Sequence, residues 1–321
     1  MAMTQEGERR ILITGGAGFV GRKLAERLRR DLPRASIILC DLVAGESPAG
    51  PILPLNVANE QDVKAIVRDV QPTSIVHLAA VSAVASSFAD PRQAWDINVM
   101  GTLNIVLALE QFVPTCHLLF ISSAEVYGRS TYGGDPVDET ALLLPANPYA
   151  ATKAAADLLV QEASHRTLRS TIVRPFNHTG PGQAPNFAVP AFCRQIAMIE
   201  KGLQEPKLMV GELNDERDFT DVSDMIDLYV RIVTRERELP NSLVLNAASA
   251  IPRRIGDVLD SLLKAAHVPI DVEVDPSKLR ATRVPRVVGN SDLAKKILGW
   301  QAQKPFSETL EDTLSYWRAQ V

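Results

Sequence analysis

The 321-residue sequence has no excess of one charge and no long apolar run. Its formal net charge is only −4, so no broad basic field indicates nucleic-acid binding. No apolar stretch approaches the roughly 20 residues that cross a bilayer, and residues 1–10 lack the apolar core of a signal peptide. We therefore expect a cytoplasmic protein with no membrane and no nucleic-acid partner.

Cysteine is also scarce. Cys40, Cys116 and Cys193 are odd in number and lack the close spacing of metal ligands. Cys40 lies in an apolar run that predicts a buried strand. All three are interpreted as reduced structural thiols, and no metal site is predicted.

The sequence does have a glycine turn between a strand pattern and a helix pattern. Residues 11–14 are apolar and β-prone, glycines follow at 15, 18 and 21, and residues 22–30 carry leucines at helical spacing. Such glycines let the backbone approach a pyrophosphate at the start of a helix. The acidic residue that this motif requires is Asp41, 20 residues after Gly21. A tight turn with no ligand is the alternative.

Apolar runs alternate with helical patterns through the first half of the chain. The predicted strands are residues 11–14, 37–40, 52–55, 75–79, 118–121 and 171–173. This alternation predicts an α/β fold with a Rossmann-type doubly wound parallel sheet, and no antiparallel strand before residue 120. We expect a cofactor lobe at residues 1–177 with a returning segment at about 218–250, and a smaller α/β substrate lobe at 178–217 and 251–321.

Ligands of such sheets bind beyond the carboxyl ends of the strands, and these ends supply the candidate cofactor residues. Asp41 can accept hydrogen bonds from both adenosine ribose hydroxyls and would repel a 2′-phosphate. NAD(H) is therefore preferred, with NADP(H) as the second candidate; an acid that only starts a turn is the alternative reading of Asp41. The candidates are Gly15, Gly18, Phe19, Val20, Gly21, Asp41, Asn56, Val57, Leu78, Ala79, Ala80, Asn98, Tyr149 and Lys153.

The candidate catalytic group is Ser123, Tyr149 and Lys153. Asn147 is a good N-cap and Pro148 a good first helical residue, so Tyr149 and Lys153 fall four apart on one helical face. An adjacent ammonium and a helix N-terminus both stabilise a phenolate, whereas an ordinary phenol with a pKa of about 10 is a poor catalyst near neutrality. Ser123 would hydrogen-bond the substrate oxygen beside the tyrosine.

These features together resemble the extended short-chain dehydrogenase/reductase family. The glycine spacing, the Tyr-x-x-x-Lys pair and the Ile-Asn-x-x-Gly-Thr-x-Asn pattern around Asn98 carry the likeness over residues 10–174. The resemblance implies that Asn98 is a buried amide that holds a water or the catalytic lysine, with simple helix packing as the alternative.

The second half of the chain is similar to the GDP-sugar reductases and 4,6-dehydratases of that family. The likeness lies in residues 174–183, 187–192, 217–222 and 298–300. It implies a GDP-sugar substrate and these contacts for it: Ser123, Asn177, His178, Val189, Arg217 and Arg280.

The resemblance implies NAD(P)H-dependent reduction of the 4-keto group of GDP-4-keto-6-deoxy-D-mannose to GDP-D-rhamnose. A 4,6-dehydratase is the alternative, because Glu125 lies two residues after Ser123, where those enzymes have a catalytic acid. Their usual threonine and arginine are replaced by Ser123 and Pro190, which disfavours it. An NAD-dependent epimerase has the same catalytic group, and a non-catalytic NAD-binding module would tend to lose Tyr149 or Lys153.

Two segments carry more apolar surface than one sheet face can cover. Residues 93–112 are apolar nearly all round, and residues 149–163 are rich in alanine. Two copies of each would form an intermolecular four-helix bundle. We therefore predict a homodimer.

Overall fold

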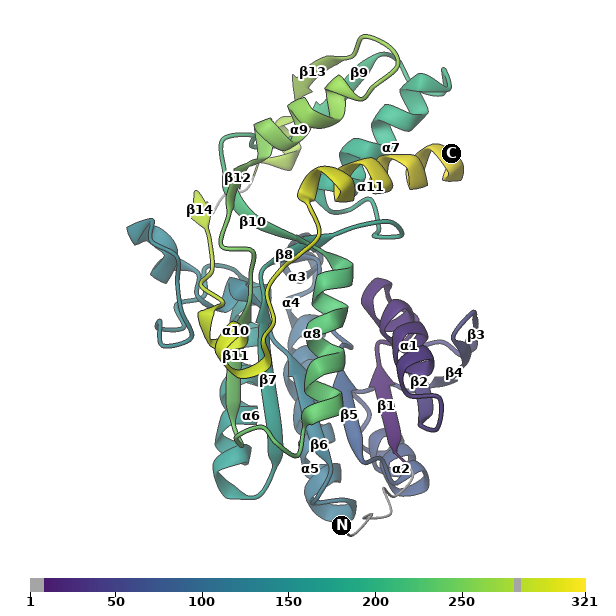
Figure 1. Ribbon diagram of the computed structural model, residues 1–321, viewed down its shortest axis with the longest axis vertical. Coiled ribbons are helices and arrows are strands. Elements are labelled where there is room, and N and C mark those ends of the chain that lie inside the picture. Colours follow the sequence, from purple (N-terminus) through teal and green to yellow (C-terminus); the bar gives the residue numbers. More distant parts are fainter. Residues whose placement is uncertain (1–8, 280–283) are drawn as a thin grey trace. The chain divides into compact units, whose positions relative to one another are not determined.

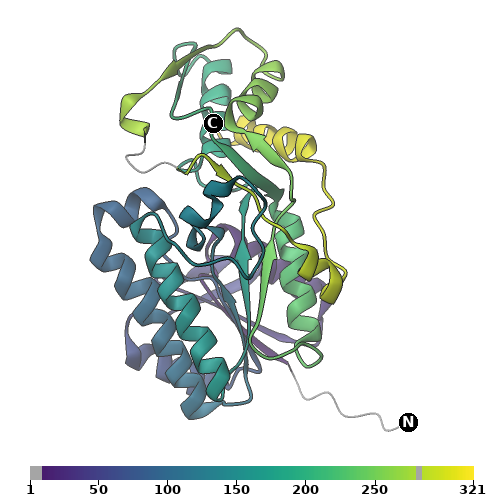
Figure 2. The same cartoon turned by 90° about the vertical axis from the view of Figure 1, so that its left-hand side faces the viewer.

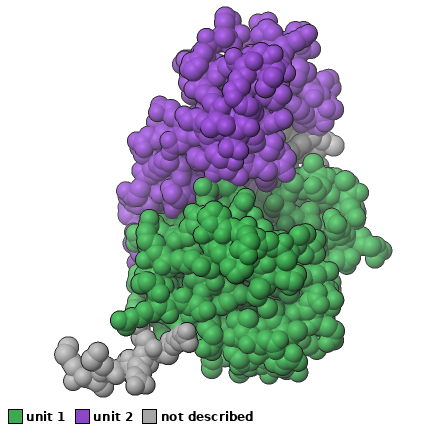
Figure 3. All heavy atoms as spheres, turned by 90° about the vertical axis from the view of Figure 1, so that its right-hand side faces the viewer, with its two compact units in different colours: residues 1–126, 147–174, 226–245 green, residues 127–146, 175–225, 246–321 purple. Residues whose placement is uncertain are grey.

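The computed structural model describes residues 9–279 and 284–321, which form two compact units. The first unit runs to residue 126 and adds residues 147–174 and 226–245, and the second holds residues 127–146, 175–225 and 246–321 (Figure 3). Residues 127–146, expected in the cofactor lobe, thus belong to the second unit. A backbone bridge from Val137 to Gly289 links them to the rest of this unit, and a second bridge, from Gly128 to Leu144, closes the segment on itself.

An eight-stranded sheet forms the centre of the first unit, in the order β11-β7-β6-β5-β1-β2-β4-β3 (Figure 1). Every predicted strand is present, and β1, β2, β4, β5, β6 and β7 pair in parallel, so the Rossmann-type sheet is confirmed. The strands are β1 (Arg10–Thr14), β2 (Ser36–Asp41), β3 (Gly45–Ser47), β4 (Gly50–Pro54), β5 (Ser74–His77), β6 (His117–Ile121), β7 (Arg169–Pro175) and β11 (Leu243–Ala247).

The prediction of no antiparallel strand before residue 120 is wrong at one edge of this sheet. Strand β3 pairs antiparallel with β4 in a short hairpin. The three residues of β3 are polar or glycine and carry no apolar alternation, so no pattern marked them as a strand.

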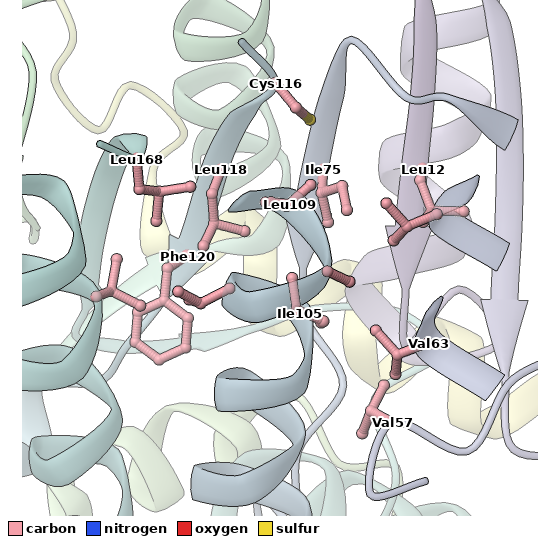
Figure 4. Packing of buried hydrophobic residues seen from close by; sticks show 14 of the residues in the cluster. Leu12, Val57, Val63, Ile75, Ile105, Leu109, Cys116, Leu118, Phe120 and Leu168 are labelled. Carbon is pink, nitrogen blue, oxygen red and sulfur yellow. The ribbon is translucent and has the colours of Figure 1, made fainter. Parts of the chain in front are cut away.

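Helices cover both faces of the sheet. Helices α2, α5 and α6 pack over the apolar cluster in Figure 4, where Leu118 and Phe120 of β6 meet Ile105 and Leu109 of α5. Helices α1 and α8 lie on the opposite face (Figures 1 and 2). The helices are α1 (Phe19–Asp31), α2 (Glu60–Val70), α3 (Val84–Ala89), α4 (Pro91–Trp95), α5 (Gly101–Phe112), α6 (Pro148–Arg166) and α8 (Val222–Arg235).

The second unit packs three helices over a core of its own. Helices α7, α9 and α11 lie near one another in this unit (Figure 1). They contribute Phe192, Leu259 and Leu314 to one apolar cluster. One of its sheets has the strand order β12-β10-β14, with β8 also paired to β10. A second sheet consists of β13 and β9. Its elements are β8 (Asn177–Thr179), α7 (Ala188–Glu200), β9 (Lys207–Val210), β10 (Glu216–Asp221), β12 (Pro252–Arg254), α9 (Ile255–Lys264), β13 (Asp271–Val274), β14 (Arg286–Val287), α10 (Asp292–Leu298) and α11 (Phe306–Gln320).

Within residues 9–279 and 284–321, no helix has the length and apolar character that crossing a bilayer would need.

Candidate active site

The glycine turn joins β1 to α1 with no room for side chains. Gly15 has a φ of 71°, and a Cβ there would lie 2.8 Å from the backbone nitrogen of Ala79. A Cβ on Gly21 would collide with the carbonyl oxygen of Gly15. Gly18 is exposed and caps α1, which then begins with Phe19 and Val20. This cradle fits the pyrophosphate of a dinucleotide, because backbone rather than side chains faces the phosphate position at a helix N-terminus.

Asp41 lies beside this turn. One carboxylate oxygen, Oδ2, accepts a hydrogen bond from the backbone nitrogen of Ala17 at 2.9 Å, and Oδ1 accepts one from Leu42 at 2.8 Å. The carboxylate therefore ties the end of β2 to the glycine turn.

The other predicted cofactor residues cluster after the neighbouring strands. Asn56 is exposed and accepts from the Ala58 backbone at 3.1 Å, whereas Val57 is buried under Gly101. Leu78 and Ala79 donate backbone hydrogen bonds to the carbonyl and hydroxyl oxygens of Thr14, at 3.1 and 3.3 Å. Together with Ala80, these residues are half-buried and stand next to the glycine turn.

Asn98 is buried in a π-helical turn, Asp96–Met100, between α4 and α5. Its amide accepts from the backbone nitrogen of Val81 at 2.8 Å and donates to the hydroxyl of Thr152 at 2.9 Å. Thr152 precedes Lys153 on α6. Asn98 thus links the π-helical turn to the helix that carries the lysine.

The structure brings Ser123, Tyr149 and Lys153 together. Asn147 caps α6 by accepting from the backbone nitrogen of Ala150 at 2.8 Å, as predicted. The Ser123 and Tyr149 hydroxyls are hydrogen bonded. Lys153 is 3% exposed, and its ammonium nitrogen donates to the Ile121 carbonyl at 2.6 Å. It also lies 4.4 Å above the centre of the Phe120 ring.

The electrostatics of this group differ from the expectation. Burial raises the pKa of Tyr149 to about 12; the hydrogen bond from Ser123 opposes this rise and the charge of Glu125 adds to it. Burial also lowers the pKa of Lys153 to about 7, against the pull of Asp157. Desolvation is therefore the largest influence on the Tyr149 phenol, larger than its hydrogen bond with Ser123. A phenol with a pKa in this range keeps its proton at physiological pH.

Glu125 is tied to the same helix by a contact that the sequence did not reveal. Its Oε2 accepts from the side-chain nitrogen of Asn147 at 2.9 Å, and its backbone nitrogen donates to Ser123 Oγ at 3.2 Å. One amide therefore both caps α6 and holds the carboxylate. The only sequence signal was the N-cap position of Asn147.

The candidate substrate residues of the second unit have varied surroundings. Asn177 is exposed on β8, and Nδ1 of His178 lies 3.2 Å from the Phe176 carbonyl oxygen. Val189 is 2% exposed and packs in the core of this unit. Arg217 forms a 3.1 Å ion pair with Asp215. Arg280 lies outside the described residues.

The described residues offer neither a metal site nor a reactive thiol. Across the described chain, no group of histidine, cysteine, aspartate and glutamate could hold a metal ion. The three cysteines are buried free thiols, and burial raises the pKa of Cys40 and of Cys193 to about 12. They are therefore unreactive at physiological pH.

Comparisons with known proteins agree over nearly the whole chain. The family model described as GDP-mannose 4,6 dehydratase matches residues 12–313. GDP-6-deoxy-D-mannose reductase of Pseudomonas aeruginosa is 31% identical over 97% of this chain and 98% of its own. The structure of RMD from Pseudomonas aeruginosa complexed with NADPH has a TM-score of 0.82 at 30% identity, and covers 98% of this chain and 100% of that one. UDP-glucose 4-epimerase of Thermus thermophilus, in complex with NAD, has a TM-score of 0.85 at 25% identity, covering 97% and 100%.

Proposed function

We propose, from the premise that this chain belongs to the GDP-mannose 4,6 dehydratase family of extended short-chain dehydrogenases/reductases, that it reduces a nucleotide sugar. Its substrate is GDP-4-keto-6-deoxy-D-mannose, its reductant is NAD(P)H, and its product is GDP-D-rhamnose. The similarity to GDP-6-deoxy-D-mannose reductase supports this choice within the family.

The observation that carries the proposal is the grouping of Ser123, Tyr149 and Lys153, with the Ser123 and Tyr149 hydroxyls hydrogen bonded and Lys153 one turn along the same helix. When bound, the reduced nicotinamide supplies the hydride that a ketone carbon accepts. The ketone oxygen must then gain a proton, and a phenol whose pKa is about 12 holds that proton at neutral pH. Ser123, hydrogen bonded to the phenol, would hold the same oxygen. Tyr149 is the proton donor and Ser123 orients the carbonyl.

The cradle formed by Gly15, Gly18 and Gly21 would hold the cofactor pyrophosphate. Asp41 would accept from the adenosine ribose, with Leu78 to Ala80 along the cofactor and Lys153 at the nicotinamide ribose. A carboxylate repels a 2′-phosphate, so we propose that NADH is preferred and NADPH is used less well. Relatives with either cofactor are known, since RMD was solved with NADPH and the Thermus thermophilus epimerase with NAD.

The second candidate function is the 4,6-dehydration of GDP-mannose. Glu125 favours it, because the carboxylate lies two residues after Ser123, close enough to Tyr149 to raise the pKa of its phenol. Ser123 and Pro190 disfavour it, because the 4,6-dehydratases usually have threonine and arginine at these positions. We therefore place dehydration second.

The residues predicted to bind the substrate keep that role in this proposal. Asn177, His178, Val189, Arg217 and Arg280 are proposed to contact the GDP-sugar.

We also propose a homodimer through α5 and α6, supported by five apolar side chains that stay exposed on the segments around these helices. They are Phe88, Trp95, Met100, Leu107 and Leu158. The cytoplasm is proposed because buried free thiols suit a reducing compartment.

The test compares the two functions in one preparation. The protein is incubated with GDP-4-keto-6-deoxy-D-mannose and NADH, and separately with GDP-mannose and NAD. We expect NADH oxidation in the first and no conversion in the second. Conversion of GDP-mannose with no net change in cofactor would establish the dehydratase instead. Tightly bound NAD in the purified protein would also favour the dehydratase, because only a reductase must release its oxidised cofactor at each turnover.

A further inference from the structure

A hollow lined by arginines lies in the first unit, at the opposite ends of the strands from the catalytic group. It measures about 410 Å³, within the range of small-molecule sites. Its lining includes Arg10, Thr73, His117, Arg169, Glu236 and Arg237. His117 begins β6, the strand whose far end leads to Ser123, so the hollow is distinct from the proposed catalytic site.

Strand register brings these side chains into one row. Ser74 pairs with His117, and His117 pairs with Arg169, across three adjacent parallel strands. Glu236, which follows α8, accepts a hydrogen bond from the Ser74 hydroxyl. Paired residues of neighbouring strands point to the same face of a sheet, so the row faces the hollow together.

The guanidinium groups are oriented by backbone oxygens. Arg10 Nε lies 3.0 Å from the Val70 carbonyl oxygen and 2.8 Å from that of Gln71, and Arg169 donates to the Glu236 carbonyl at 3.2 Å. Among the residues that the structure describes, no carboxylate lies within ion-pair distance of Arg10, Arg169 or Arg237. Three cations therefore share a hollow with the single carboxylate of Glu236.

His117 adds a second, independent observation. It is 4% exposed, and its Nδ1 has no hydrogen-bond partner in the described chain, although Glu236 Oε2 lies 3.8 Å away. A buried polar nitrogen without a partner is rare in folded proteins and calls for an explanation. Burial raises the pKa of Glu236, while its hydrogen bond to Ser74 and the charges of Arg9, Arg237 and Arg169 oppose that rise.

We propose that this hollow is an accessory binding site for a small phosphate-bearing anion. Guanidinium groups bind phosphate oxygens in a fork, and the two held by backbone oxygens lose little freedom on binding. His117 and the Thr73 hydroxyl would complete the polar lining.

Inorganic phosphate is the first probe, titrated by calorimetry at constant ionic strength. Saturating NADH is present, so that phosphate cannot bind at the glycine turn. We expect saturable binding that weakens at least about tenfold in Arg237→Gln and in Arg169→Gln. Arg237 is exposed, so Arg237→Gln should fold normally. It keeps the test valid if Arg169→Gln fails to fold. The control is Arg68→Gln on α2, which removes an exposed arginine paired with Asp69 and should bind as wild type.

Glycerol phosphate is the second probe and distinguishes the source of the anion. Tighter binding than inorganic phosphate identifies a phosphorylated metabolite, and weaker binding identifies free phosphate. The proposal is overturned if no saturable binding occurs, if NADH abolishes it, or if Arg237→Gln and Arg169→Gln bind as tightly as wild type.

Discussion

Replacing Lys153 with methionine should stabilise the protein while it destroys activity. The side chain is 3% exposed, and its polar partners among the described residues are the Ile121 carbonyl and, at longer range, the Asp157 carboxylate. A charged lysine at this depth opposes folding, since its ammonium leaves water. Methionine has similar length and no charge, so it fills the space without that opposition.

The magnitude follows from the depressed pKa of Lys153, which burial lowers from 10.5 to about 7. At ~1.4 kcal/mol per pKa unit, the free energy opposing folding at pH 7 is about 4 kcal/mol. Loss of the hydrogen bond to Ile121 offsets about 1 kcal/mol. We therefore expect Lys153→Met to raise the free energy of unfolding at pH 7 by on the order of 3 kcal/mol.

The pH dependence gives a second, sharper readout. Between pH 7 and 8.5 the unfolded chain keeps the lysine proton while folded Lys153 loses it, so the unfolded state binds more protons. Wild-type stability should then rise with pH by about 2 kcal/mol more than that of Lys153→Met. The comparison stops near pH 8.5 because the cysteines affect stability above that pH. Burial raises the pKa of Cys40 and Cys193 to about 12, so the thiols of the unfolded chain ionise at a lower pH than those of the folded chain.

The assay is urea unfolding at both pH values, with turnover measured on the same samples. Lys64→Met is the control, because Lys64 forms an exposed ion pair with Glu60 and its loss should change stability by less than about 1 kcal/mol. We expect Lys153→Met to lower kcat/KM by about a hundredfold or more. If Lys153→Met were less stable than wild type and its stability had the same pH dependence, burial of the lysine charge would not oppose folding and this reasoning would be refuted.

Three further variants test the remaining roles. Tyr149→Phe should reduce kcat by a factor of about 100 to 10,000 while NADH affinity stays within about twofold, and near-normal turnover would remove Tyr149 as the proton donor. The wild type should prefer NADH over NADPH by at least about tenfold in kcat/KM, and Asp41→Asn, which keeps an acceptor for Ala17, should narrow that gap; equal use of both cofactors by the wild type argues against a ribose contact. Glu125→Gln should retain reduction within a few-fold, because Asn147 can still hold the side chain, and a loss as large as that of Tyr149→Phe would make Glu125 catalytic.

Local features of the site could be predicted from the sequence. The N-cap Asn147, the helix that it begins and the four-residue spacing of Tyr149 and Lys153 depend on neighbouring residues only. The glycine turn is equally local, since β1, the turn and α1 follow one another along the chain. These predictions held because short-range chemistry fixed them.

Features set by distant contacts could not be predicted. The bond between Glu125 and Asn147 joins residues 22 apart, and the raised pKa of Tyr149 follows from burial by the folded chain. The β3–β4 hairpin is polar and short, so it carries no apolar pattern. In the second unit, the apolar core that includes Val189 brings together α7, α9 and α11, which lie far apart in the sequence.

The most direct test of the central claim is a deuterium transfer experiment. NADH deuterated at the transferable position of its nicotinamide is incubated with GDP-4-keto-6-deoxy-D-mannose and the protein, and the product is analysed by NMR. The account predicts GDP-D-rhamnose with one deuterium at sugar carbon 4 and one NAD released per product formed. Unchanged ketone, or deuterium at any other sugar carbon, would contradict it.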